Sequence, residues 1–187
     1  MAKLIYSAIM SLDGYIEDRT GHFDWAQPDA EVHGFINNLE RPVGIYLYGR
    51  RMYTMMVGWE TDPALADQST LMRDFAGIWQ AASKTVYSRT LQEATTSNTR
   101  IEREFDAEAI RGLKTSAASD LAIGGPDLAA HAFRAGLVDE CHIFLIPIVV
   151  GGGKPGLPPD STLNLTLHEE RRFAGGTVFL RYQVNPR

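Results

Sequence analysis

Residues 121–136 read LAIGGPDLAAHAFRAG, and this stretch decides the fold class. Its first three residues are an apolar run typical of a buried strand, which a glycine pair and a proline end. A helical pattern follows, because apolar side chains recur at positions 128, 129, 132 and 133 and a glycine stands at 136. A strand that enters a helix through a tight turn indicates an α/β protein.

Strands and helices alternate along the rest of the chain. Apolar runs predict strands over residues 3–10, 43–48, 83–87, 101–105 and 141–150. Periodicity predicts one helix opening at Asp29, another over residues 71–79 and a third capped by Asp106. Residues 163–173 and 177–184 flank a glycine pair and predict a hairpin. We therefore expect one α/β domain over residues 1–187, with a mostly parallel sheet and an antiparallel C-terminal hairpin.

Composition excludes several classes of protein. Hydrophobic residues make up 44% and charged residues 22%, which is ordinary for a globular domain. The net charge of −5 argues against a general nucleic-acid-binding surface. The longest apolar stretch, residues 143–150, is far shorter than the ~20 residues of a membrane span. Cys141 is the single cysteine, and no signal-peptide pattern follows Met1, so we expect a cytoplasmic protein without disulfides.

Motifs of metal and hydrolytic enzymes are missing. The five histidines are scattered without paired spacing, so we expect no metal site. The zinc deaminase signature, the G-x-S-x-G elbow and the P-loop are all absent. The chemistry must therefore lie elsewhere, and the carboxyl ends of the strands are where open α/β sheets bind ligands.

Three loops at predicted strand ends have residues suited to phosphate. The glycine pair before the helix at 126 suits a pyrophosphate, although such a sequence also forms ordinary turns. Arg50 and Arg51 follow a strand and can bind phosphate oxygens, or they are a solvated pair at a helix start. Residues 88–90 read Ser-Arg-Thr, which suits either a phosphate monoester or a polar turn.

Acidic residues near the first helix admit two interpretations. Asp29 is well placed as a helix N-cap, and Glu31 favours the first turn for dipole reasons. Both also flank the apolar face of that helix, so either could face a cleft. Asp13, in the loop after the first strand, is a third candidate acid.

The order of these motifs resembles the dihydrofolate-reductase-like superfamily. Residues 11–16 (SLDGYI), Asp24-Trp25 and residues 49–53 (GRRMY) occur in the superfamily's order. Residues 146–153 (IPIVVGGG) are similar to the reductase domain of riboflavin biosynthesis and its stand-alone relatives. The resemblance spans residues 3–184 and implies a dihydrofolate-reductase-like three-layer fold.

The same resemblance implies NADPH held across the strand ends, and a cis peptide between Gly124 and Gly125. By this resemblance the cofactor-binding positions are Ala8, Ile9 and Ile16 near the nicotinamide, Gly49, Arg50, Arg51 and Met52 over the phosphates, Ser88, Arg89 and Thr90 at the 2′-phosphate, and Ile123, Gly124, Gly125, Pro126, Asp127 and Leu128 at the pyrophosphate. The candidate catalytic residues are Asp29, Glu31 and Asp13.

The implied activity is hydride transfer from NADPH to a small heterocyclic or carbonyl substrate, as in 5-amino-6-(5-phosphoribosylamino)uracil reductase. True dihydrofolate reductases have an acid in the first helix, where this chain has Ala30, which speaks against dihydrofolate as substrate. A non-catalytic NADPH-binding protein and a true dihydrofolate reductase remain alternatives. Relatives of the riboflavin type also lead us to expect a homodimer.

Overall fold

One large sheet organises the protein. The computed structural model describes residues 1–186, and its main sheet has the strand order β5-β4-β3-β6-β1-β7-β10-β9. Every pairing from β5 to β7 is parallel, whereas β10 runs antiparallel to both β7 and β9. The predicted mostly parallel sheet with an antiparallel C-terminal hairpin is confirmed.

The elements have the following bounds. The strands are β1 (Leu4–Ser11), β2 (Tyr15–Asp18), β3 (Val43–Gly49), β4 (Ser83–Tyr87), β5 (Thr99–Glu102), β6 (Asp120–Gly124), β7 (Glu140–Ile146), β8 (Gly153–Pro155), β9 (Leu165–Arg172) and β10 (Val178–Val184). The helices are η1 (Asp24–Ala26), α1 (Ala30–Glu40), α2 (Arg50–Met56), α3 (Gly58–Thr61), α4 (Pro63–Ala66), α5 (Thr70–Ala81), α6 (Ala107–Ser116) and α7 (Pro126–Arg134).

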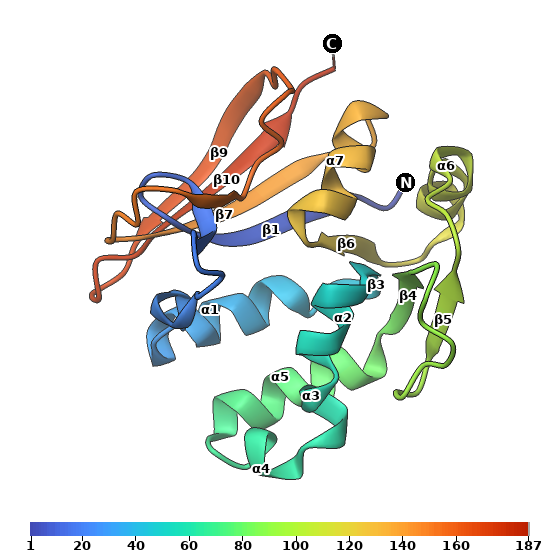
Figure 1. Ribbon diagram of the computed structural model, residues 1–187, viewed down its shortest axis with the longest axis horizontal. Coiled ribbons are helices and arrows are strands. Elements are labelled where there is room, and N and C mark those ends of the chain that lie inside the picture. The colour runs from blue at the N-terminus through green and yellow to red at the C-terminus, as the bar shows by residue number, and fades with distance from the viewer. Residues whose placement is uncertain (187) are drawn as a thin grey trace.

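Helices cover both faces of the sheet, which gives three layers (Figure 1). On one face, Val32 of α1 packs against Phe144 of β7 and Phe179 of β10, and α5 buries Trp79 beside β3. On the other face, α7 buries Phe133 in a cluster that also includes residues of β1, β6 and α6. Burial of these apolar faces is the main force that holds the layers together. The predicted three-layer α/β fold is confirmed.

Two strand predictions were wrong at their ends. Strand β7 stops at Ile146 and does not reach residue 150, because Pro147 has no N–H to continue the ladder. Strand β5 covers Thr99–Glu102 and not residues 101–105. It lies at the edge of the sheet and buries only alternate residues partly, so residues 99–102 have no apolar run that marks the bounds of the strand.

A second, two-stranded sheet was not predicted. Strand β2 pairs antiparallel with β8, and we call this pair the β2–β8 ribbon. Gly153 adopts φ +146°, and a Cβ there would collide with the carbonyl oxygen of Glu17 and the backbone of Asp18. The ribbon therefore needs glycine for its close pairing. Both strands are short, and β2 is half polar, so neither has a clear sequence signal.

Candidate functional site

The parallel order of the sheet places four candidate loops side by side. Strands β4, β3, β6 and β1 are consecutive neighbours, so their carboxyl ends form one continuous border, which we call the carboxyl edge. The segments that leave it are residues 88–90, 49–52, 124–128 and 11–16. Most of the residues predicted to hold a cofactor therefore come from adjoining segments, as the sequence led us to expect.

Two helices that begin at this edge have no side-chain cap. Helix α2 starts from Gly49 and helix α7 from Gly125, and neither start has a side-chain acceptor within residues 1–186. By contrast, Asp29, Ser69 and Asp106 accept backbone N–H bonds at the starts of α1, α5 and α6. The first-turn N–H groups of α2 and α7 thus remain available to oxygen atoms of a ligand.

The glycine pair fits closely against α2. A Cβ on Gly124 would lie 2.9 Å from Cε1 of Tyr48 and 3.2 Å from Cγ of Met52. Gly125 has φ +88°, which a side chain would strain. No peptide bond in residues 1–186 is cis, so the expected cis bond between the two glycines is wrong. The positive φ of Gly125 makes the turn, and Pro126 then opens the helix.

Other residues predicted around the pyrophosphate lie differently. Ile123 is fully buried in the core, so only its backbone faces the edge. Asp127 is exposed, and its Oδ2 accepts from Nζ of Lys154 at 2.5 Å. Leu128 is half-buried against the same core cluster.

The arginines of the edge differ in their partners. Arg50 Nη1 donates to Oγ1 of Thr90 at 2.7 Å, which joins the loop after β3 to the loop after β4. Arg51 makes a forked pair with Glu17, and Arg89 pairs with Glu104 at 3.2 Å. Among the described residues, Arg50 has no acidic partner. It is therefore the cation of this edge best able to bind an incoming phosphate.

Hydrogen bonds that involve Ser88 and Arg103 stabilise the loop after β4. The buried Ser88 hydroxyl accepts the N–H groups of Thr90 at 3.3 Å and Leu91 at 3.0 Å. Arg103 Nη1 donates to the carbonyl oxygens of Ser88 at 3.0 Å and Leu91 at 2.7 Å. The predicted hydroxyl is thus engaged in the turn, and Arg103, which sequence reasoning missed, supports it.

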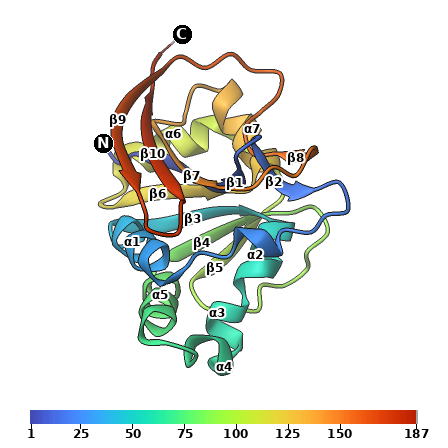
Figure 2. The same ribbon diagram turned by 90° about the vertical axis from the view of Figure 1, so that its left-hand side faces the viewer.

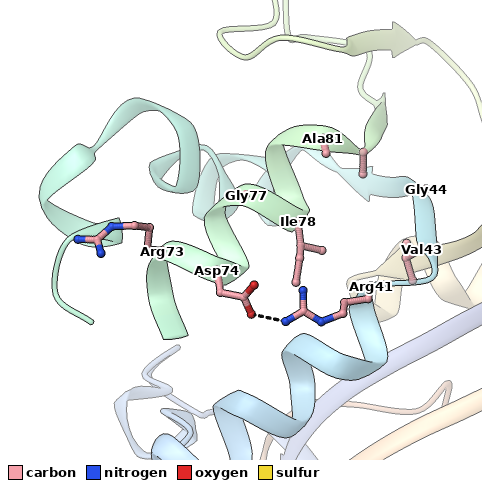
Figure 3. Close-up of a pocket in the computed structure, with 9 residues that line it drawn as sticks. Arg41, Val43, Gly44, Arg73, Asp74, Gly77, Ile78 and Ala81 are labelled. Atoms are coloured by element: carbon pink, nitrogen blue, oxygen red, sulfur yellow. Dashed lines mark hydrogen bonds and ion pairs between the residues drawn. The ribbon is translucent and has the colours of Figure 1, made fainter. Parts of the chain in front are cut away.

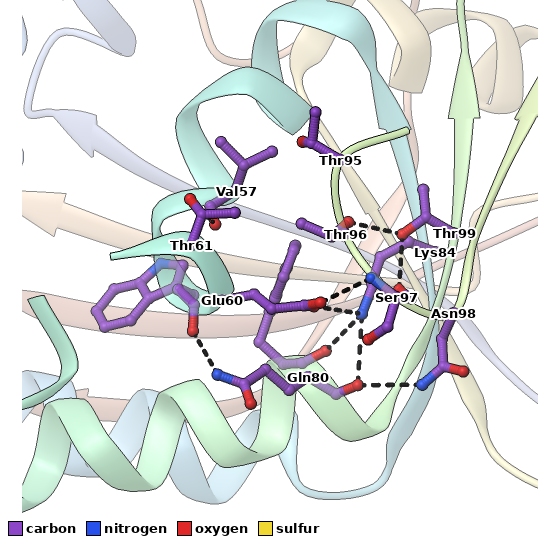
Figure 4. A network of polar contacts seen from close by, with 12 residues as sticks. Val57, Glu60, Thr61, Gln80, Lys84, Thr95, Thr96, Ser97, Asn98 and Thr99 are labelled. Carbon is purple, nitrogen blue, oxygen red and sulfur yellow. Dashed lines mark hydrogen bonds and ion pairs between the residues drawn. The ribbon is translucent and has the colours of Figure 1, made fainter. Parts of the chain in front are cut away.

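A buried polar network anchors the rest of that loop (Figure 4). Lys84 Nζ, fully enclosed, donates to the carbonyl oxygen of Trp79 at 3.2 Å and lies 3.9 Å from Oε2 of Glu60. Glu60 Oε1 accepts the N–H of Ser97 at 2.7 Å. Burial lowers the pKa of Lys84, and the nearby Glu60 carboxylate partly offsets this effect. The only sequence signal of this network is a lone lysine within a predicted strand.

The three candidate acids each hold backbone in place. Asp29 Oδ1 accepts the N–H of Val32 at 2.9 Å, so the predicted cap is confirmed. Glu31 Oε2 accepts the N–H of Ala174 in the β9–β10 turn at 3.0 Å. Asp13 lies in the β1–β2 loop and accepts two N–H groups of the loop after β7. The three acids therefore bind three different segments of backbone.

The electrostatics of Asp13 keep it ionised. Desolvation raises its pKa, but hydrogen bonds from the hydroxyl of Ser11 and from the amides of Gly151 and Val150 outweigh that effect, and the pKa is lowered. A proton donor near neutral pH needs the opposite shift.

The predicted nicotinamide contacts lie on two faces. Ala8 and Ile9 are successive residues of β1, so their side chains point to opposite sides of the sheet. Ala8 and Ile16 pack towards the α7 side, whereas Ile9 packs towards α1. A single ring can therefore contact the side chain of only one of the two β1 residues.

A groove elsewhere in the molecule is not part of this site. Arg41, Val43 and Gly44 line it together with one side of α5, and Arg41 pairs with Asp74 at 2.8 Å (Figure 3). Because residues 43 and 44 are at the amino end of β3, the groove lies at the opposite end of that strand from Gly49.

The described residues form neither a metal-binding cluster nor a membrane-spanning helix. In the part of the chain that the structure describes, no group of three or more histidine, cysteine, aspartate or glutamate side chains could hold a metal ion. Nor does any helix in residues 1–186 have the length and apolarity to cross a membrane.

Fold and edge together define a dihydrofolate-reductase-like α/β protein. The RibD C-terminal domain family model matches residues 2–179, and the chain belongs to that family. It is 29% identical over 188 residues to the uncharacterized protein YyaP of Bacillus subtilis strain 168, covering 98% of this chain and 95% of that protein.

Solved structures share the fold. A protein of Shewanella sp. PV-4 named for riboflavin biosynthesis superposes with a TM-score of 0.76 at 23% identity, with 100% of both chains covered. The diaminohydroxyphosphoribosylaminopyrimidine deaminase/5-amino-6-(5-phosphoribosylamino)uracil reductase of Thermotoga maritima superposes with a TM-score of 0.64 at 14% identity. That match covers 98% of this chain and 57% of the larger protein.

Proposed function

We propose that this protein is an NADPH-dependent reductase that transfers hydride to a small heterocyclic or carbonyl substrate. The observation that carries the proposal is the pair of uncapped helix starts at the carboxyl edge, with Arg50 beside them. Two sets of N–H donors and a cation without an acidic partner suit a ligand with several phosphates. Reductases of the same fold support the assignment.

The residues fit the cofactor in the following way. The N–H groups at the start of α7 would bind the pyrophosphate, and Arg50 with the start of α2 would bind the neighbouring phosphate oxygens. Arg89 and Thr90 would contact the 2′-phosphate, which would favour NADPH over NADH. When bound, NADPH supplies the hydride, while the protein orients the substrate and excludes water.

A candidate substrate donor lies in η1, beside β1. The indole Nε1 of Trp25 is buried and has no acceptor within residues 1–186, and η1, which includes Trp25, packs against β1. An unpaired indole N–H suits a carbonyl oxygen or a ring nitrogen. We propose that Trp25 helps to orient the group that is reduced.

The proton that completes the reduction needs its own test. The lowered pKa of Asp13 favours a role in fixing the loop after β7 rather than in donating a proton. For Asp29 and Glu31, alanine variants distinguish the two roles. Loss of stability alone indicates that the carboxylate only accepts backbone hydrogen bonds, whereas loss of turnover in a folded protein indicates a role in catalysis.

The proposal is tested by following NADPH oxidation with purified protein and a panel of phosphoribosylamino-pyrimidines and small carbonyl compounds. We expect turnover with at least one substrate and a lower kcat/KM with NADH. Tight NADPH binding without turnover across the panel would favour the alternative, a non-catalytic binding protein, which the missing acid at Ala30 also suggests.

Three further features belong to this proposal. We propose that the chain is one domain, that it forms a homodimer and that it works in the cytoplasm. Light scattering after size-exclusion chromatography checks the dimer, and a monomer at micromolar concentration would overturn that part.

A further inference from the structure

Two ion pairs connect the β2–β8 ribbon to the two uncapped helices. Glu17 of β2 binds Arg51 of α2, with Oε2 2.5 Å from Nη2 and Oε1 3.1 Å from Nη1. Lys154 of β8 binds Asp127 of α7 at 2.5 Å. Figure 2 shows the ribbon on the side of the molecule where α2 and α7 also lie. The ribbon's charges therefore meet the first turns of both helices.

Glu17 occupies the donors that a phosphate would use. Arg51 is the second residue of α2, next to Arg50, and both of its Nη atoms already bind Glu17. Carboxylate and phosphate oxygens accept the same forked pair of N–H bonds from a guanidinium group. The Glu17 side chain is only 14% exposed, whereas that of Arg51 is 60% exposed. Arg51 can thus turn towards a ligand in solvent, but Glu17 cannot follow it.

Other hydrogen bonds also connect the segments that flank β8 to the rest of the protein. The hydroxyl of Tyr6 donates to the carbonyl oxygen of Gly156, just after β8. Asp13 binds the amides of Val150 and Gly151 just before β8. An isolated two-stranded ribbon is only marginally stable, so these hydrogen bonds contribute to the stability of the β2–β8 ribbon. Loss of Glu17 charge should therefore leave the fold intact.

We propose that Glu17 is a built-in competitor of the cofactor phosphates for Arg51. This inference rests on the proposed function, because it takes the ligand of the carboxyl edge to be a phosphate-bearing dinucleotide. In the free protein Glu17 neutralises Arg51. On binding, a phosphate takes over the Arg51 N–H groups and leaves the Glu17 carboxylate without its partner, so part of the binding free energy is lost in breaking the ion pair.

The test is a double-mutant cycle on ligand binding. Glu17→Gln should bind NADPH and NADH about 2- to 5-fold more tightly than the wild type, the range expected for a partly exposed ion pair. In an Arg51→Gln background the same change should have no effect. Asp67→Asn, which breaks the exposed pair with Arg73 at 2.9 Å, is the matched control and should leave both affinities unchanged.

Inorganic pyrophosphate, titrated against the same variants, separates the two proposals. If Glu17→Gln tightens pyrophosphate binding while no variant binds NADPH, the competition holds and the proposed function fails. If the wild type binds NADPH but Glu17→Gln gives no gain, or an equal gain in the Arg51→Gln background, the competition is overturned. No binding of either ligand overturns both.

Glu17→Asp provides a second variant if the glutamine protein melts early. It keeps the charge but shortens the side chain by one methylene, so it should weaken the forked pair. A rise in NADPH affinity over the wild type supports the proposal, and no rise contradicts it.

Discussion

Five helices of this protein, α1, α2, α5, α6 and α7, begin in two different ways. Helices α1, α5 and α6 start after connecting segments, and Asp29, Ser69 and Asp106 cap them. Helices α2 and α7 start from Gly49 and Gly125, directly at the ends of the paired strands β3 and β6. A glycine at the N-cap costs only a few tenths of a kcal/mol relative to a residue with a side-chain acceptor, so the missing caps at these two places lower stability slightly.

The difference indicates where a ligand completes the structure. Unsatisfied N–H groups at a helix start attract anions, and the helix dipole adds to that attraction. At the two uncapped starts the chain also supplies Arg50, which has no acidic partner within the described residues. We propose that the capped starts contribute to stability and that the uncapped starts at the carboxyl edge contribute to ligand binding.

The largest expected effect is that of Arg50→Met on ligand binding. Charge-assisted hydrogen bonds to phosphate are strong, so NADPH affinity should fall about 10- to 100-fold. Arg73→Met removes an exposed arginine far from the edge and should leave affinity unchanged. Fluorescence titration of both variants with NADPH checks this. An equal loss of NADPH affinity in both would show that Arg50 has no special role in binding.

Gly125→Ala should destabilise the protein by about 1–2 kcal/mol, because a side chain is strained at φ +88°. Gly49→Ala is its matched control, since Gly49 has φ −74° and no atom within 4 Å of an added Cβ. We expect the control to stay within about 0.5 kcal/mol of the wild type in urea unfolding. Similar losses of unfolding free energy in the two variants would show that the positive φ of Gly125 does not require glycine.

Asp106→Ala removes a cap that accepts the N–H groups of Glu108 and Ala109. It should cost about 1 kcal/mol of stability and leave the NADPH dissociation constant unchanged. Urea unfolding and a binding titration on the same sample measure both quantities. A weaker NADPH affinity would show that capped starts also take part in binding.

The smallest expected effect on stability is that of Gly49→Ser, which gives α2 the cap it lacks. Replacing an N-cap glycine by serine gains only a few tenths of a kcal/mol, and the new hydroxyl competes with the ligand for the same N–H groups. We therefore expect slightly higher stability together with weaker NADPH binding. Gains in both stability and affinity would argue against a ligand at the start of α2.

Local patterns allowed much of this fold to be predicted from the sequence. Apolar runs indicated β1, β3, β4 and β6, and the spacing of apolar residues indicated α1 and α7. The caps Asp29 and Asp106 were also predicted, because a cap depends on residues only two or three positions away. The order of strand ends then brought the candidate loops to one edge.

Contacts between distant segments could not be predicted in the same way. The β2–β8 ribbon pairs residues more than one hundred positions apart and has only a few residues in each strand. The acidic partners of Arg51 and Arg89, Glu17 and Glu104, are likewise set by tertiary structure. Sequence reasoning therefore found cations suited to phosphate but not the carboxylates that already neutralise two of them.

The most direct test of the account is the NMR response of backbone amides to NADPH in isotope-labelled protein. We predict that the largest shift changes fall on the first-turn amides of α2 and α7, at residues 50–52 and 127–128. The capped starts of α5 and α6 should show little change. Saturable binding with its largest changes at the capped starts, or no change at either uncapped start, would contradict the central claim.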